Sequence, residues 1–115
     1  MDDVKGLKPV AHRREVIDWR DNLDKGAVLS QVFSMDGISL LYVATPAYAM
    51  ALAKRLTQAR AYRGRVGIFY HRMPQEAGAT LEKALQQGEL SLVITAELAK
   101  ESLAQYFRRL VLYHL

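Results

Sequence analysis

Five short apolar runs, rich in β-branched and aromatic residues, recur along the 115-residue chain and alternate with stretches of helical spacing. The runs are VIDW (16–19), ISLLYVA (38–44), RVGIFY (65–70), LSLVIT (90–95) and RRLVLYH (108–114). Several are continuously apolar, which is typical of strands buried on both faces of a parallel sheet. The pattern predicts a three-layer α/β domain with a mostly parallel five-stranded sheet and helices on both faces.

The clearest helix signal follows the second run. Thr45 is suited to the N-cap and Pro46 to the first helical position. Apolar residues then recur at helical spacing on one face: Ala49, Leu52, Ala53 and Leu56. We therefore expect a helix here that packs on the sheet.

Three further helices are predicted from spacing and stop signals. One begins near Pro74, ends at a left-handed Gly88 and should bury Ala77, Leu81, Ala84 and Leu85. Another runs from about Leu23 to Phe33 and contains Gly26, and a short one runs from Glu97 to about Tyr106. These segments supply the crossovers that parallel strands require.

The length of the chain fits one domain with one core. Residues 1–15 show no period and contain Gly6 and Pro9, so we predict a lead-in arm or linker before a domain spanning 16–115. The last apolar run reaches almost to Leu115, and we expect the domain to be part of a longer protein. The lack of cysteine, of a membrane-length apolar run and of a signal peptide favours a cytoplasmic protein without membrane contact.

Charge is distributed unevenly along the chain. The formal net charge is +4, but no Asp or Glu occurs between Gly37 and Gln75, and that stretch alone carries +6. Its cations are Lys54, Arg55, Arg60, Arg63, Arg65 and Arg72. Such a local positive field indicates an anionic partner, unless these residues are simply solubilising side chains spread over a surface.

The residues that most enzymes and metal proteins need are missing or scattered. Neither a phosphate-binding Gly-x-x-x-x-Gly-Lys-Ser/Thr loop nor a Gly-x-Gly-x-x-Gly turn is present. The histidines His12, His71 and His114 lie far apart in sequence without carboxylates at ligand spacing. We expect no catalytic residue, no metal and no cofactor in this domain.

Asp18 and Asp21 follow the first run, where a phospho-acceptor domain would cluster its acids. Such a domain also needs an aspartate after the third strand and a lysine after the fifth, and this chain has Tyr70-His71 and His114 there. We therefore expect Asp18 to form a local ion pair or helix cap with Arg20.

Several aromatic residues are interleaved with the basic stretch. Tyr42, Tyr48, Phe69 and Tyr70 fall within predicted strands and helices and suit core packing. Tyr62, in the turn RAYRGR, is the ring we expect outside the core, and Trp19 is a second candidate. Arginine with an exposed ring suits single-stranded nucleic acid, because arginine neutralises phosphate and a ring stacks on any base.

The segments SLLYVATPAYAMALAKRL, RVGIFYHRMPQEAGATLEKALQQGELSLVIT and RRLVLYHL, in that order, resemble the second RecA-like domain of superfamily-two helicases. The likeness covers residues 38 to 115. It implies a helicase C-terminal topology, but the residues for nucleotide hydrolysis differ: Gly78 stands where the family has arginine, and Glu101 and Leu103 where it has glycine and aspartate. The resemblance therefore implies a domain without ATP hydrolysis.

The lead run VIDWRDN, ahead of the helicase-like part, looks like the C-terminal domain of RecJ-type single-strand-specific exonucleases. This resemblance implies a non-catalytic accessory module of a 5′-3′ exonuclease in DNA repair or recombination. Its partners would be single-stranded DNA and the other domains of the parent nuclease, which carry the metal-binding nuclease residues. The sequence is silent on the oligomeric state.

In helicase domains of this shape, the nucleic-acid strand passes over the loops after the second and third strands. The resemblance thus places one group of residues near the phosphates, namely Thr45, Tyr48, His71 and Arg72. It makes a second group an outer electrostatic track: Arg55, Arg60, Arg63 and Arg65. Tyr62, chosen from its place in the arginine-rich turn, is the ring predicted to stack on a base. The alternative is a docking module that binds the parent enzyme or a repair protein and never contacts DNA.

Overall fold

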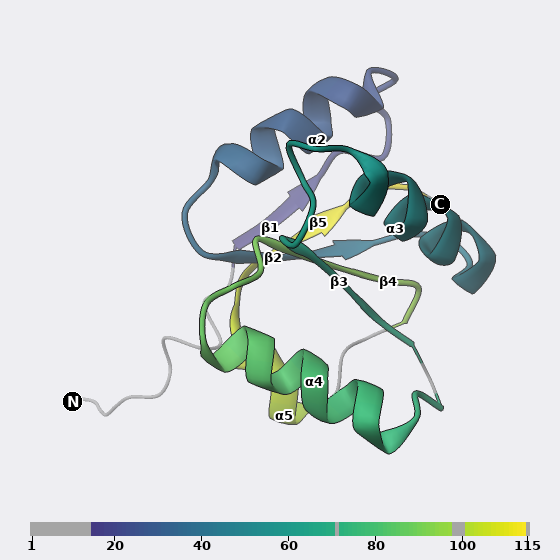
Figure 1. Cartoon of the computed structure of the whole chain (residues 1–115). Coiled ribbons are helices and arrows are strands. Elements are labelled where there is room, and N and C mark those ends of the chain that lie inside the picture. Colours follow the sequence, from purple (N-terminus) through teal and green to yellow (C-terminus); the bar gives the residue numbers. More distant parts are fainter. Residues whose placement is uncertain (1–14, 71, 98–100, 115) are drawn as a thin grey trace.

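The computed structural model describes residues 15–70, 72–97 and 101–114, and the predicted arm lies outside these ranges apart from Glu15. Within these ranges, five strands alternate with four helices (Figure 1). In order they are β1 (Glu15–Asp18), α2 (Lys25–Ser34), β2 (Ile38–Tyr42), α3 (Pro46–Gln58), β3 (Val66–Phe69), α4 (Gln75–Gln86), β4 (Leu92–Thr95), α5 (Glu101–Ala104) and β5 (Phe107–Leu112). All five predicted strands are confirmed.

The strands form one sheet in the order β1-β5-β2-β4-β3, and every neighbouring pair is parallel. The chain crosses the sheet from β1 through β2 to β3 and then returns through β4 to β5. Because right-handed crossovers place a helix on a face that depends on the direction of travel, α2 and α3 cover one face and α4 and α5 the other (Figure 1). The α/β fold and its parallel sheet are thus confirmed.

Alternate residues of the central strands divide the core into two halves. Leu41 and Val43 face α2 and α3, while Ile38 and Leu40 face α4 and α5. The same alternation separates Leu92 and Ile94 from Val93 on β4. A strand buried on both faces places its side chains in apolar surroundings on either side, which explains the nearly continuous apolar runs.

Helix boundaries follow the capping residues. Thr45 Oγ1 accepts a hydrogen bond from Tyr48 N at 3.1 Å and starts α3 as predicted. Helix α2 begins two residues later than expected, because Asp24 is its N-cap and its Oδ1 accepts a hydrogen bond from Ala27 N. Leu23 therefore lies before the helix, and its side chain is 95% exposed.

Helix α4 ends as the sequence predicted. Gly88 has φ +69, its N–H donates to Leu85 O, and Glu89 N donates to Ala84 O. This pair of hydrogen bonds is the Schellman arrangement, which requires a left-handed residue. The buried stripe is narrower than predicted: Leu81 and Leu85 are buried, whereas Ala77 and Ala84 are half-exposed. Within the described ranges, no helix has the length and apolar composition needed to cross a membrane.

Candidate nucleic-acid interface

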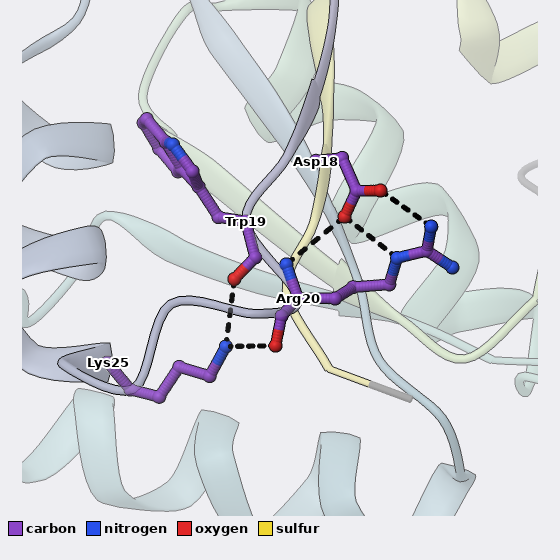
Figure 2. A network of polar contacts seen from close by, with 4 residues as sticks. All are labelled: Asp18, Trp19, Arg20 and Lys25. Atoms are coloured by element: carbon purple, nitrogen blue, oxygen red, sulfur yellow. Dashed lines mark hydrogen bonds and ion pairs between the residues drawn. The ribbon is translucent and has the colours of Figure 1, made fainter.

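At the carboxyl end of β1, Asp18 and Arg20 form a bidentate ion pair (Figure 2). Arg20 Nε lies 2.8 Å from Asp18 Oδ1 and Arg20 Nη2 lies 2.6 Å from Oδ2; Arg20 N also donates to Oδ1 at 3.1 Å. These hydrogen bonds lower the pKa of Asp18 to about 2. The predicted local ion pair is confirmed.

Lys25 joins the carboxyl ends of β1 and β5. Its Nζ donates to the backbone carbonyls of Trp19 at 3.0 Å, Arg20 at 3.3 Å and Tyr113 at 2.6 Å. The first two contacts are visible in Figure 2. An ammonium group has three protons, so all of its donors are used internally and Lys25 acts as a structural clamp.

Thr45 and Tyr48 lie at the carboxyl end of β2 but are both engaged within the domain. The Thr45 hydroxyl caps α3. The Tyr48 ring stacks on His114, with centroids 4.4 Å apart, and lies tilted against Tyr113 at 6.5 Å. The Tyr113 side chain is fully buried, and this burial raises its pKa to about 12.

Arg72 follows β3 and is exposed, with a φ of 66 that is uncommon for a residue with a side chain. It lines a cavity of about 450 Å³ between the β3–α4 loop, α4 and Leu103 of α5. Its neighbour His71, also predicted to contact phosphate, lies outside the described residues.

Arg65 has a structural role. Its guanidinium donates to Ser91 Oγ at 3.0 Å and to Phe33 O at 3.1 Å, and lies 5.2 Å from the centroid of the Phe33 ring. These contacts tie the start of β3 to α2 and to the segment before β4. Arg65 is therefore held inside the domain rather than along an outer track.

Tyr62 corrects a second expectation. Its ring stacks on Phe33 with centroids 4.1 Å apart and an interplanar angle of 12°, and it packs against the core under α2 and α3. The prediction that this ring lies outside the core is wrong, because the α3–β3 turn folds back onto the end of α2 and an apolar ring face is buried there.

The remaining cations lie together on one part of the chain. Four are exposed on the second half of α3 and the turn that follows it: Lys54, Arg55, Arg60 and Arg63. Within the described part of the chain, none of the four side chains pairs with a carboxylate, and that part of the sequence contains no acid. We call these four residues the basic segment. Lys54 was not selected as a binding residue from the sequence.

The residues predicted for one interface are divided between two edges of the sheet. Thr45 and Arg72 follow β2 and β3 and so lie at the carboxyl edge, whereas Arg60, Arg63 and Arg65 precede β3 and lie at its amino end. The strand predicted over 65–70 lies between the two groups, and its two ends are at opposite edges of the sheet. The basic segment is the part of the predicted surface whose residues follow one another closely in sequence, on the second half of α3 and the turn after it.

The described residues contain no group of three or more His, Cys, Asp or Glu side chains that could hold a metal ion. The chain matches no protein-family model, and the comparisons with curated proteins and with solved structures also give no match.

Proposed function

We propose that this domain is a non-catalytic accessory module of a single-strand-specific DNA exonuclease and that it binds single-stranded DNA through the basic segment. The observation that carries the proposal is the exposure of Lys54, Arg55, Arg60 and Arg63, which lie within ten residues of sequence on a stretch without acidic residues. The exonuclease assignment, with its role in repair or recombination and its helicase C-terminal topology, comes from the resemblance described above.

Binding of this kind is electrostatic and independent of base sequence. Each phosphate that a cation neutralises releases counterion, so affinity falls as salt rises. Four contacts to a single strand correspond to a slope of about −2.8 in log K against log salt, at about −0.7 per contact. Tyr62, the ring between Arg60 and Arg63, already stacks on Phe33, which favours phosphate contacts over base stacking.

The path proposed for the strand differs from the one that the helicase likeness implies. The Thr45 hydroxyl and the Tyr48 ring are occupied by contacts within the domain. Arg72 lies at the other end of β3 from the basic segment. We therefore place the strand over the end of α3 and the α3–β3 turn, away from the loops after β2 and β3.

The test compares two double variants with the same change in net charge. Lys54→Glu with Arg60→Glu reverses the basic segment, and Lys83→Glu with Arg72→Glu reverses two exposed cations elsewhere. Arg65 is excluded because it supports the fold. Binding of a fluorescent oligo-dT of about 15 nucleotides is followed by anisotropy over a salt series.

We expect the first variant to bind at least about tenfold more weakly with a shallower salt slope, and the second to keep most of the wild-type affinity. Equal loss in both variants would show an effect of net charge alone and would contradict the proposed site. A wild-type domain that does not bind the oligonucleotide would refute DNA binding and leave the docking alternative.

A further inference from the structure

Among the described residues, strand β3 is the last strand of the sheet and pairs on one side only, with β4 (Figure 1). The carbonyl of Arg65 accepts from Leu92 N, so Arg65 and every second residue after it turn their backbone groups toward β4. Val66 and Ile68 therefore direct their N–H and C=O groups outward, and no hydrogen bond from these groups occurs among the described residues. An edge of this kind is a template for a further strand.

An apolar groove runs along this edge beside α4. It has a volume of about 380 Å³ and is lined by residues of β3, α4 and the segments around them, among them Val66, Ile68, Ala77, Ala84 and Leu90. Thr80 and Tyr70 carry the hydroxyl groups among its lining residues, and none of the described residues that line it is charged. Ala77 and Ala84 are half-exposed because the sheet ends at β3 and does not extend under this side of α4.

The groove depends on Gly67. A Cβ at this position would lie 2.9 Å from Leu81 Cδ1 and 2.9 Å from Leu90 Cδ1. The missing side chain lets Leu81 and Leu90 approach the strand, so the floor of the groove is close to the β3 backbone. A side chain from an added strand would thus have an apolar surface to cover beside the free hydrogen-bonding groups.

Charge identifies the occupant. Exposed arginines flank β3 at both ends, Arg63 before it and Arg72 after it, and no acid occurs from β2 to the start of α4. Antiparallel pairing of β3 with a second copy of the chain would place Arg63 of one copy beside Arg72 of the other, and like charges opposite each other are destabilising. A peptide with carboxylates at both ends complements the same edge.

We propose that the β3 edge and its groove bind an extended peptide segment of a partner protein, with alternating apolar side chains between acidic ends, as a sixth strand of the sheet. Backbone hydrogen bonds to Val66 and Ile68 would supply affinity, while the groove and the flanking arginines would supply selectivity. This surface shares Arg63 with the basic segment, but the groove and the open strand edge lie outside that segment, so the proposal goes beyond the proposed DNA binding and does not depend on it.

The probe is a synthetic fluorescent peptide of about ten residues, enough to span β3 and both arginines, with alternating Val and Thr between paired aspartates. One control peptide has the central amides N-methylated, and another has lysine in place of aspartate. Ala84→Glu tests the groove, and Ala79→Glu, on an exposed position of the same helix, is its matched control. Binding is measured by anisotropy, and self-association by sedimentation.

We expect the aspartate peptide to bind the wild type and the Ala79→Glu variant. Its affinity for the Ala84→Glu variant should be lower by about tenfold or more, because the glutamate places in the groove a charge of the same sign as the aspartates of the peptide. Arg72→Glu should weaken binding, and both control peptides should bind poorly. Equal binding of the N-methylated peptide, no effect of Ala84→Glu, or a dimer that Ala84→Glu abolishes would each overturn the proposal. The Lys54→Glu, Arg60→Glu variant should bind the peptide normally, so failure of DNA binding is distinguishable from failure here.

Discussion

Replacing Arg65 with alanine should destabilise the domain, although the sequence places this residue in an exposed basic stretch. The substitution removes two hydrogen bonds from a charged donor, to Ser91 Oγ and Phe33 O, each worth about 1.5–3 kcal/mol. It also removes a cation–π contact with the Phe33 ring, worth about 0.5–1 kcal/mol at partly exposed sites. Because Arg65 is only half-buried, water can replace part of this loss, and we expect a decrease slightly below the sum of the lower values, about 3 kcal/mol in the free energy of unfolding.

The assay is urea and thermal unfolding followed by far-UV circular dichroism. A loss of about 3 kcal/mol lowers the Tm by roughly 12 °C for a domain of this size. Arg65→Lys should recover little of it, since an ammonium group does not reproduce the fork that reaches two acceptors. Arg60→Ala is the matched control, and an exposed arginine without a described partner should change stability by less than about 0.5 kcal/mol. If Arg65→Ala were as mild as Arg60→Ala, the structural role assigned to Arg65 would be refuted.

Three further outcomes test other parts of the structure. In an NMR titration the Asp18 carboxyl should titrate near pH 2, and its pKa should return toward about 3.9 in the Arg20→Gln variant. Because the folded pKa lies below the unfolded one, the ion pair stabilises the fold above about pH 4, and this stabilisation is lost as the pH falls toward 2. A native Asp18 titrating near 4 would contradict the ion pair. Tyr113→Phe should leave the stability near neutral pH unchanged within about 1 kcal/mol, because the buried hydroxyl makes no hydrogen bond with the described residues. Between pH 10 and 12 the variant should resist unfolding better than the wild type. The wild type loses stability there because the pKa of Tyr113 is raised to about 12 in the folded state. Thermal unfolding across that pH range measures both, and a strongly destabilised variant would indicate a missed partner. Gly88→Ala should cost about 1 kcal/mol because φ is +69, whereas Gly78→Ala, in the interior of α4 with open space at the Cβ, should stabilise by about 0.5–1 kcal/mol. Urea unfolding of the two variants should give changes in unfolding free energy of opposite sign, and changes of equal sign would contradict the geometry of the helix end.

Local signals in the sequence predicted much of the fold. The strands appeared as continuous apolar runs because a central parallel strand buries both faces, as Leu40 and Leu41 do on β2. Caps appeared because they depend on a few neighbouring residues: Thr45 at the start of α3 and Gly88 after α4. The Asp18–Arg20 pair spans two residues and was equally accessible from the sequence.

The candidate site was less predictable. A stretch without acids correctly indicated a concentration of positive charge, but neighbours in sequence were separated by β3, whose two ends lie at opposite edges of the sheet. Tyr62 and Arg65 were misassigned because their partner, Phe33, lies about thirty residues earlier on α2, and no local pattern identifies such a contact. Ala84 was predicted to be buried but is half-exposed for a related reason: the apolar spacing along α4 does not show where the sheet beneath the helix ends.

The sequence by itself determined which segments become strands and helices, the caps that begin α3 and end α4, and how much positive charge the stretch between Gly37 and Gln75 carries. These properties depend on hydrophobic periodicity and on contacts between residues a few positions apart. The tertiary structure alone decided the strand order, and with it which strand became an open edge, which arginines remained free for a partner and which were consumed in packing. Those outcomes depend on pairing between residues distant in the chain, and Arg65, held by Phe33 and Ser91 rather than by its neighbours, is the example in this domain.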